Sequence, residues 1–422
     1  MTRLACLIIV LCLLTPPARA AAAERPNLIL ILCDDLGYGD LACYGNPKIK
    51  TPNLDRLAAE GVRLTDFYCA GAQCTPSRAG LLTGRYPVRF GLTYTLMTNA
   101  GAGIPDSEIL LPQVLKTAGY STMLAGKWHL GDQPRYHPLR HGFDHFFGLL
   151  RGHDTEPRAL YQDNRIIDPE ADLATLTSCY THAATAFVKQ QAAAHHPFFL
   201  MLAHTSPHTP LATAPAFKGK SAGGAYGDTV EEIDDSVGQM LAALKDAGVA
   251  DDTLIFFSSD NGPSIDKGKD GGSTGPLRAG KFSTFEGGVR VPAIAWMPGR
   301  IKPRVEHRPA ILLDCFPTFL SIAGAKLSTG RAVDGKDLSS LLFDNKPRDG
   351  DTFFFYFQDH LQACRQGDWK LKLPDKGNDP PMLFDLKTDP GESHDLSADH
   401  ADVVKDLRRR MEQFDRSIPR DR

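Results

Sequence analysis

Cysteine, long apolar runs and excess positive charge are all scarce in this 422-residue sequence. The nine cysteines are too widely spaced for a zinc knuckle or a small disulfide scaffold. A balance of 47 basic against 50 acidic residues argues against nucleic acid as a partner, although a slightly acidic chain can still bind an anion where basic residues gather. Internal repeats and Asn-x-Ser/Thr glycosylation sites are absent. The composition is that of a large globular protein with roughly two domains.

The strongly apolar stretch that does occur lies at the amino terminus. Arg3 precedes an apolar run from Leu4 to Leu14, and Ala18-Arg19-Ala20 has the form of a signal-peptidase cleavage site. Eleven apolar residues are too few to span a bilayer, which requires about 20. We therefore predict a signal peptide over residues 1–20, export to the periplasm, the extracellular space or the lysosome, and no membrane span after cleavage.

Export also bears on the remaining cysteines, because an exporting compartment permits disulfides. Their spacing does not reveal which of them would pair. The cysteines beyond the predicted signal are Cys33, Cys43, Cys69, Cys74, Cys179, Cys315 and Cys364.

One of these cysteines opens the dense pattern Cys-Thr-Pro-Ser-Arg-Ala-Gly-Leu-Leu-Thr-Gly-Arg over residues 74–85. Pro76 and the apolar residues after Arg78 predict a tight turn that leads into a short helix. The first turn of a helix stabilises an anion, and Arg78 adds a fixed positive charge. A lone cysteine is more often a small buried hydrophobe, whereas this pattern favours a reactive group at Cys74.

Two apolar segments end in oxygen-bearing side chains. Residues 27–32 read as a buried parallel strand followed by Asp34 and Asp35, and residues 253–259 as a second strand followed by Asp260 and Asn261. Each acidic end alone could be a solvated turn. Ligands of open α/β sheets bind at the carboxyl ends of strands, and three carboxylates with an amide oxygen suit Ca²⁺ or Mg²⁺ rather than zinc.

These patterns together resemble the sulfatase family, in its arylsulfatase A and N-acetylgalactosamine-6-sulfatase branch, through nearly the whole mature chain. The Cys-x-Pro-Ser-Arg pattern with its Leu-Thr-Gly continuation resembles the first family signature. Gly-Lys-Trp-His-Leu-Gly at residues 126–131 matches the second, and Gly280-Lys281 with Glu-Gly-Gly-Val-Arg-Val-Pro at residues 286–292 matches the third.

The resemblance implies that Cys74 is oxidised after synthesis to formylglycine, an aldehyde held as its hydrate. One hydroxyl of that hydrate would attack sulfur, and the other would lose its proton and expel the sulfate from the covalent sulfo-enzyme intermediate. A formylglycine-generating enzyme is therefore an implied partner, which must act on Cys74 before this segment folds.

Five further residues receive catalytic roles from the resemblance. Lys127 and Lys281 would hold the sulfate oxygens, and Arg78 would add positive charge beside them. His129 would take the proton from the second hydroxyl, and His208 would donate one to the leaving oxygen. Taken alone, Lys127 would more often be a surface charge and His129 a structural histidine.

The resemblance also implies a metal site, whose ion is usually calcium in the family and for which magnesium is the alternative. Its ligands are expected to be Asp34, Asp35, Asp260 and Asn261 together with Cys74 as formylglycine. Glu286 and Arg290, by contrast, are expected to hold their own loop together. The acidic residues of the helix predicted at 228–248 are expected to form a solvated face rather than a second metal site.

Two loops depart from the family and are expected to set the choice of substrate. Residues 89–104 include Tyr94 and Asn99, which are candidates for substrate contact, although an ordinary surface loop explains them as well. The second loop spans residues 149–173. In arylsulfatase A a serine comes just before a His-Asp pair in this region, whereas in this sequence Gly152 precedes His153-Asp154. That change removes a side-chain hydroxyl from this position and leaves His153 and Asp154 as the candidate pocket residues.

The fold expected is α/β: an alkaline-phosphatase-like, doubly wound mixed sheet flanked by helices, with a small C-terminal α+β subdomain. We place the catalytic domain at residues 24–340 and the subdomain at residues 341–422. Strand patterns at 353–357, 362–373 with a turn at Gly367-Asp368, and 382–386 predict an antiparallel meander, and residues 402–414 a final helix.

The function expected is hydrolysis of a sulfate ester on a sulfated sugar, a glycosaminoglycan or an aryl sulfate. A phosphonate monoester or phosphodiester hydrolase of the same superfamily is the nearest alternative, because it would share the nucleophile and the metal. A carbohydrate-binding relative without catalytic activity is a second alternative. The sequence leaves open whether the chain forms a homodimer.

Overall fold

The computed structural model describes residues 25–97, 100–327, 330–348, 350–375 and 379–419. The predicted signal peptide and Asn99 lie outside the described residues. Within the described part of the chain, no helix combines the length and the apolar character needed to cross a bilayer.

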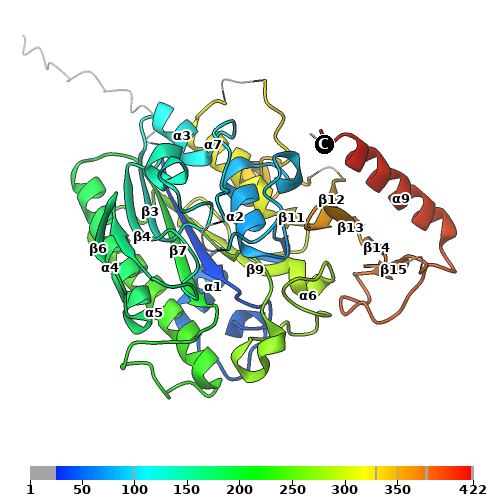
Figure 1. Cartoon of the computed structure of the whole chain (residues 1–422), viewed down its shortest axis with the longest axis horizontal. Coiled ribbons are helices and arrows are strands. Elements are labelled where there is room, and N and C mark those ends of the chain that lie inside the picture. The colour runs from blue at the N-terminus through cyan, green and yellow to red at the C-terminus, as the bar shows by residue number, and fades with distance from the viewer. Residues whose placement is uncertain (1–24, 98–99, 328–329, 349, 376–378, 420–422) are drawn as a thin grey trace, which may run out of the picture.

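A mixed sheet runs through the centre of the molecule (Figure 1) in the order β10-β2-β9-β8-β1-β7-β3-β4-β5-β6, with β11 paired to β2. The central strands β8, β1, β7, β3 and β4 are parallel, whereas β9 runs antiparallel to β8 and β2, and β5 and β6 form an antiparallel hairpin at one edge. The strands are β1 (Asn27–Asp34), β2 (Val62–Tyr68), β3 (Ser121–Lys127), β4 (His145–Leu149), β5 (Leu160–Gln162), β6 (Arg165–Asp168), β7 (Phe198–Pro207), β8 (Thr253–Ser259), β9 (Arg290–Trp296), β10 (Arg304–Glu306) and β11 (Ala310–Ile311).

Alternation along β1 explains why helices cover both faces of this sheet. Leu28, Leu30 and Leu32 belong to one buried cluster, whereas Ile29 and Ile31 belong to the other. Since successive side chains of a strand point to opposite faces, a strand that is apolar throughout must be covered on both. One layer holds α1 (Pro52–Glu60), α4 (Leu176–Ala193) and α5 (Gly224–Asp246), and the other holds α2 (Cys74–Thr83), α3 (Leu111–Thr117), α7 (Cys315–Ala323) and α8 (Ser339–Asp344). The doubly wound α/β prediction is confirmed.

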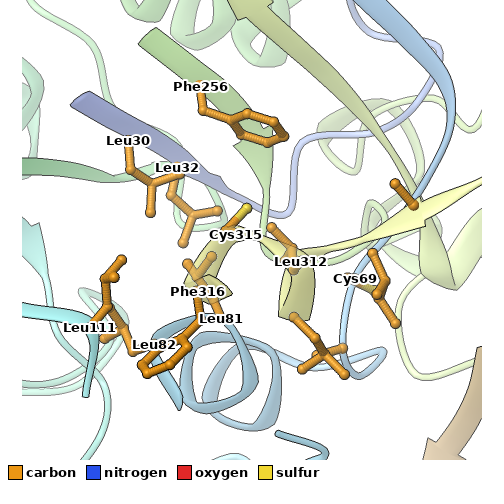
Figure 2. Close-up of a cluster of buried hydrophobic side chains, with 14 of the residues drawn as sticks. Leu30, Leu32, Cys69, Leu81, Leu82, Leu111, Phe256, Leu312, Cys315 and Phe316 are labelled. Carbon is orange, nitrogen blue, oxygen red and sulfur yellow. The ribbon is translucent and has the colours of Figure 1, made fainter. Parts of the chain in front are cut away.

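The helix that begins at Cys74 is held rigidly in this core. All ten residues of α2 are buried. Figure 2 shows Leu81 and Leu82 of α2 beside Phe316 of α7 and below Leu30 and Leu32 of β1. Full burial of a leucine contributes roughly 1.5–3 kcal/mol, so these contacts fix the position of the helix and of its first residue.

The C-terminal region forms a separate antiparallel sheet, as predicted. Its order is β12-β13-β14-β15, and Gly367, with φ of 58°, occupies the tight turn between β13 and β14. The last helix packs on this sheet, where the rings of Phe354 and Phe414 stack with centroids 4.0 Å apart. The elements are β12 (Thr352–Phe357), β13 (His360–Gln366), β14 (Trp369–Lys372), β15 (Met382–Asp385) and α9 (Ala401–Arg416). The domain boundary at residues 340/341 stays a prediction.

A buried ionic network joins the small sheet to the large one. Lys370 Nζ of β14 lies 2.8 Å from Glu286 Oε1 and 3.0 Å from Glu392 Oε1, and none of these three side chains is exposed. Glu286 opens α6 (Glu286–Val289), and its Oε2 lies 3.3 Å from Arg290 Nη1. Glu286 therefore binds the two sheets together, and its pair with Arg290 also holds their own loop together.

The prediction of a solvated acidic face on α5 holds for Asp235, which is exposed, but is wrong for three other acidic residues of the helix. Asp228, Glu232 and Asp234 are at most 4% exposed. Asp228 accepts hydrogen bonds from the backbone N–H groups of residues 219, 220 and 221, and Asp234 accepts them from the N–H groups of residues 53 and 54. These carboxylates are buried because they satisfy loop amides that would otherwise have no partner.

The seven cysteines beyond the predicted signal are all free thiols in this structure. Five of them are buried, and Cys43 and Cys179 are partly exposed.

Candidate active site

The parallel pairing of β1 with β8 brings the two acidic strand ends together. Cys33 is in register with Ser259, so Asp34 and Asp35 lie beside Asp260 and Asn261. Single ligand atoms of Asp34, Asp35, Cys74 and Asp260 all lie within 4.8 Å of one another, and all four residues are buried. The structure thus gathers five residues from three separate segments into one cluster.

Asn261 provides a test of whether this cluster fits a cation. Its Nδ2 donates to Asp35 Oδ1 at 2.7 Å and to the carbonyl of Gly262 at 2.9 Å. Its Oδ1 is buried and has no hydrogen-bond partner among the described residues. An unpartnered buried acceptor is costly unless something binds it. An amide oxygen beside three carboxylates is the donor set of a hard cation such as Ca²⁺ or Mg²⁺, so the residues fit the predicted metal.

Cys74 lies at the first position of α2, with its Sγ 3.2 Å from Asp34 Oδ1. Burial, followed by the charge of Asp34, raises the pKa of this thiol well above its usual value. Reactive cysteine nucleophiles have the opposite property, a lowered pKa that yields the thiolate. The raised pKa therefore does not favour thiolate chemistry at Cys74.

Three basic side chains pair with the three carboxylates. Lys127 Nζ forms an ion pair with Asp34, and Lys281 Nζ lies 2.8 Å from Asp35 Oδ2. Arg78 Nε lies 2.8 Å from Asp260 Oδ2. Three negative and three positive charges balance, so a divalent cation would leave this site with an excess of positive charge suited to an anionic group.

The carboxylates of this cluster are perturbed in opposite directions. Although burial acts to raise it, the pKa of Asp34 is held well below its usual value by Lys127 and His208. Burial and the charge of Asp34 raise the pKa of Asp260 to about 7. Such divergent shifts within one cluster are typical of functional sites.

The two predicted catalytic histidines make different contacts at the site. His129 Nε2 donates to the carbonyl of Leu96 at 2.9 Å, which leaves Nδ1 as the bare nitrogen, and Nδ1 has no partner within the described part of the chain. Burial and then the charge of Lys127 lower the pKa of His129 well below its usual value, so the ring is neutral. His208 donates from Nδ1 to the carbonyl of Thr209, and its Nε2 lies 3.7 Å from Asp35 Oδ2.

One of the two candidate pocket residues of the 149–173 loop, His153, reaches the site. The ring of His153 packs edge-on against that of His208, with centroids 5.4 Å apart, and is 3% exposed. Asp154, the next residue, is exposed. The sequence motifs do not separate these two residues, because no signature covers residues 149–173 and only the fold brings this loop to the end of β7. Tyr94 is 49% exposed, as an ordinary surface loop would also predict.

Comparison with known protein families shows to which family the chain that carries this cluster belongs. The model of the Sulfatase family matches residues 26–325, which is more than half of the chain. The chain belongs to the sulfatase family. A second model, described as the C-terminal region of N-sulphoglucosamine sulphohydrolase, matches residues 280–417 of this sulfatase.

Individual relatives agree with this assignment. The sulfatase is 39% identical to N-acetylgalactosamine-6-sulfatase of Sus scrofa over 444 residues, covering 92% of this chain and 85% of that protein. It is 37% identical to arylsulfatase A of Homo sapiens over 456 residues, covering 95% and 89%. The crystal structure of Ps i-CgsB in complex with k-i-k-neocarrahexaose superposes with a TM-score of 0.85 at 32% identity, covering 94% of each chain.

These likenesses confirm the predicted family, its branch and the alkaline-phosphatase-like fold. The sulfatase is accordingly an enzyme, a sulfuric ester hydrolase.

Proposed function

We propose that this sulfatase removes sulfate from a sulfated sugar, using Cys74 as its formylglycine derivative beside a divalent cation. The observation that carries the proposal is the placement of Cys74 within 4.8 Å of three carboxylates, in a cluster whose remaining amide oxygen has no partner among the described residues.

In the proposed metal site, Asp34, Asp35, Asp260 and Asn261 hold the ion through oxygen, with the modified Cys74 as a further ligand. Ca²⁺ is the ion we expect, and Mg²⁺ is the alternative, because both prefer all-oxygen sites. When bound, the ion supplies positive charge that polarises a sulfate oxygen.

Formylglycine supplies a geminal diol, one hydroxyl for attack on sulfur and one whose deprotonation releases the sulfate without a second water. The cations around it complement the charge that develops on the sulfuryl oxygens. Lys127 and Lys281 are the groups that we assign to those oxygens, and Arg78 holds Asp260 in place while adding its own charge.

The two histidines divide the proton transfers. His129 is neutral with a bare Nδ1, which suits a general base for the second hydroxyl. His208 presents Nε2 toward Asp35, at the edge of the cluster, and is the group that we assign as the donor to the leaving oxygen.

Conversion of Cys74 must precede folding. The side chain is 1% exposed at the start of a helix whose ten residues are all buried, so no enzyme could reach it in the folded protein. We therefore retain a formylglycine-generating enzyme as a partner, and export through the predicted signal peptide of residues 1–20 as the route.

The names of the relatives suggest the substrate. One is an N-acetylgalactosamine-6-sulfatase, and the solved structure of Ps i-CgsB holds a neocarrahexaose. We propose a sulfated glycan, and N-acetylgalactosamine 6-sulfate as the first sugar to test.

The test is to measure hydrolysis by protein with converted Cys74 on 4-nitrophenyl sulfate, N-acetylgalactosamine 6-sulfate and bis(4-nitrophenyl) phosphate. Sulfate release from the first two with much slower phosphodiester cleavage supports the proposal. Faster cleavage of the phosphodiester would favour the phosphonate and phosphodiester hydrolase alternative. No turnover of any of them by fully converted, calcium-loaded protein would favour the non-catalytic alternative.

A further inference from the structure

A buried carboxylate outside the metal cluster joins three segments of the chain. Asp40 is 1% exposed, and no lysine or arginine of the described residues lies close enough to balance its charge. Its Oδ2 accepts hydrogen bonds from the backbone N–H of Gly37 at 2.7 Å and from the hydroxyl of Tyr226 at 2.6 Å, and its Oδ1 accepts one from the N–H of Ser273 at 2.8 Å. Because a buried charge is costly without such bonds, these three donors have to stay in place around it.

The first of the three segments is the loop of residues 34–40, which carries two of the predicted metal ligands. This loop packs backbone to backbone against the second segment, since the N–H of Gly39 donates to the carbonyl of Ser273 at 2.9 Å. A Cβ on Gly37 would lie 2.2 Å from that carbonyl oxygen, and one on Gly39 would lie 2.4 Å from the nitrogen of Gly275. Glycine permits this close approach, so the two loops are in direct contact beside Asp40.

The second segment, residues 263–282, fixes one of those metal ligands from two places. The hydroxyl of Ser264 donates to Asp35 Oδ2 at 2.9 Å, and Lys281 Nζ donates to the same oxygen at 2.8 Å. Ser273 lies between these two residues in the sequence, so its bond to Asp40 holds the middle of a segment whose ends both orient Asp35.

The third segment is α5, which contributes Tyr226. This side chain is 3% exposed, and its hydroxyl oxygen lies 2.6 Å from Asp40 Oδ2 and 3.2 Å from the carbonyl oxygen of Asp35. A Cβ on Gly272 would lie 2.5 Å from the same hydroxyl oxygen. One phenol therefore contacts both loops at the point where they meet.

We propose that Tyr226 and Asp40 are positioning residues of the metal site. Their hydrogen bonds hold the two loops in the arrangement in which Asp35 presents its carboxylate to the cation. The affinity for Ca²⁺ consequently depends on a hydroxyl that is not itself a ligand, because partners of this kind orient the groups that bind the metal. This inference rests on the proposed function, since it requires the proposed metal site.

The test measures Ca²⁺ affinity in two variants and a matched control. Tyr226→Phe removes the hydroxyl and keeps the ring, and Asp40→Asn keeps the shape while replacing one acceptor oxygen by a donor. The control is Tyr120→Phe, which removes another buried hydroxyl, one that donates to the carbonyl of Pro26 at 2.8 Å before the amino end of β1. Calorimetric titration of Ca²⁺ into the EDTA-treated protein should show about 10-fold weaker binding in both test variants and a change of less than about 2-fold in the control.

Two further measurements separate positioning from a general loss of stability. Hydrogen–deuterium exchange of the metal-free protein should be faster in residues 35–40 and 273–281 of Tyr226→Phe than of Tyr120→Phe. In converted enzyme at saturating Ca²⁺, kcat for 4-nitrophenyl sulfate should return to within about 2-fold of the parent value, because both test variants keep every group assigned to the substrate. Circular dichroism verifies folding, and Tyr226→Phe alone decides if Asp40→Asn does not fold.

Parental Ca²⁺ affinity in Tyr226→Phe, an equal loss of affinity in Tyr120→Phe, or a kcat that stays low at saturating Ca²⁺ would overturn this role and leave the proposed function standing. A parent protein that binds neither Ca²⁺ nor Mg²⁺ would overturn the proposed metal site as well.

Discussion

The guanidinium of Arg78 donates from Nε to Oδ2 of Asp260 across 2.8 Å, and neither side chain has any exposed surface. The same arginine donates from Nη1 to the carbonyl of Lys127 at 2.9 Å. The side chain of Arg78 thus joins α2 to the ends of β8 and β3. The contact between Arg78 and Asp260 links residues that are 182 positions apart in the sequence.

Replacing Arg78 by leucine should destabilise the metal-free protein by about 3–5 kcal/mol, because buried carboxylates lose their partner. Urea unfolding in EDTA measures this change. The matched control is Arg56→Leu, which removes an exposed pair with Glu60 and should cost at most about 1 kcal/mol. Equal losses in the free energy of unfolding would show that the buried Arg78–Asp260 pair stabilises the protein no more than the exposed Arg56–Glu60 pair does.

The metal site should depend on the unpartnered oxygen of Asn261. Asn261→Ala should weaken Ca²⁺ binding at least about 10-fold, since it removes a ligand from an all-oxygen set. Calorimetric titration of Ca²⁺ into the EDTA-treated protein measures the affinity, and Asn164→Ala, in the exposed turn between β5 and β6, is the control. Chelation should also abolish turnover, and added Ca²⁺ should restore it. Unchanged affinity in Asn261→Ala would remove this residue from the ligand set.

Lys370 should contribute to stability through the network that joins the two sheets. Lys370→Met leaves Glu286 and Glu392 buried without their shared cation and should cost about 3–5 kcal/mol. Chemical unfolding measures the loss, with Lys387→Met as the exposed control. If the two variants unfold at the same denaturant concentration, the small sheet is not held by this network.

His204 should make stability depend on pH. Burial lowers its pKa from 6.5 to about 4, so the unfolded chain binds more protons than the folded protein between these values. Its stabilising contribution is therefore complete above about pH 6.5 and is lost as the pH falls toward 4. Between pH 7.5 and 5 the loss is about 2 kcal/mol.

Comparison of urea midpoints at pH 7.5 and 5 for the parent protein and His204→Gln tests this contribution. The variant should show a smaller drop in stability at pH 5 than its parent. His182→Gln, on the exposed side of α4, should keep the drop of the parent. An identical drop in His204→Gln would assign the pH dependence to other groups.

The sequence predicted the parts of this molecule in which local pattern decides structure. Continuous apolar runs predicted β1 and β8, and their register placed Asp34 and Asp35 beside Asp260 as expected. The matched signatures also named residues that the structure brings into contact, such as Lys281 with Asp35.

The features that the sequence could not predict depend on contacts between segments that are far apart in the chain. The acidic residues of α5 looked solvated because helical periodicity does not show that Asp234 would satisfy the amides of residues 53 and 54. The partnership of Glu286 with Lys370, 84 positions later, likewise exists only once the two sheets have packed. The approach of His153 to His208 has the same origin, since it requires β4 and β7 to flank β3.

The central claim, that catalysis requires the modified form of Cys74, is tested most directly by measuring initial rates of 4-nitrophenyl sulfate hydrolysis in preparations with different degrees of conversion. Mass spectrometry of the peptide that contains Cys74 gives the converted fraction in each preparation. The rate per mole of protein should rise in proportion to this fraction and reach zero at zero conversion. A full rate in unconverted protein, or in Cys74→Ala, would contradict the account.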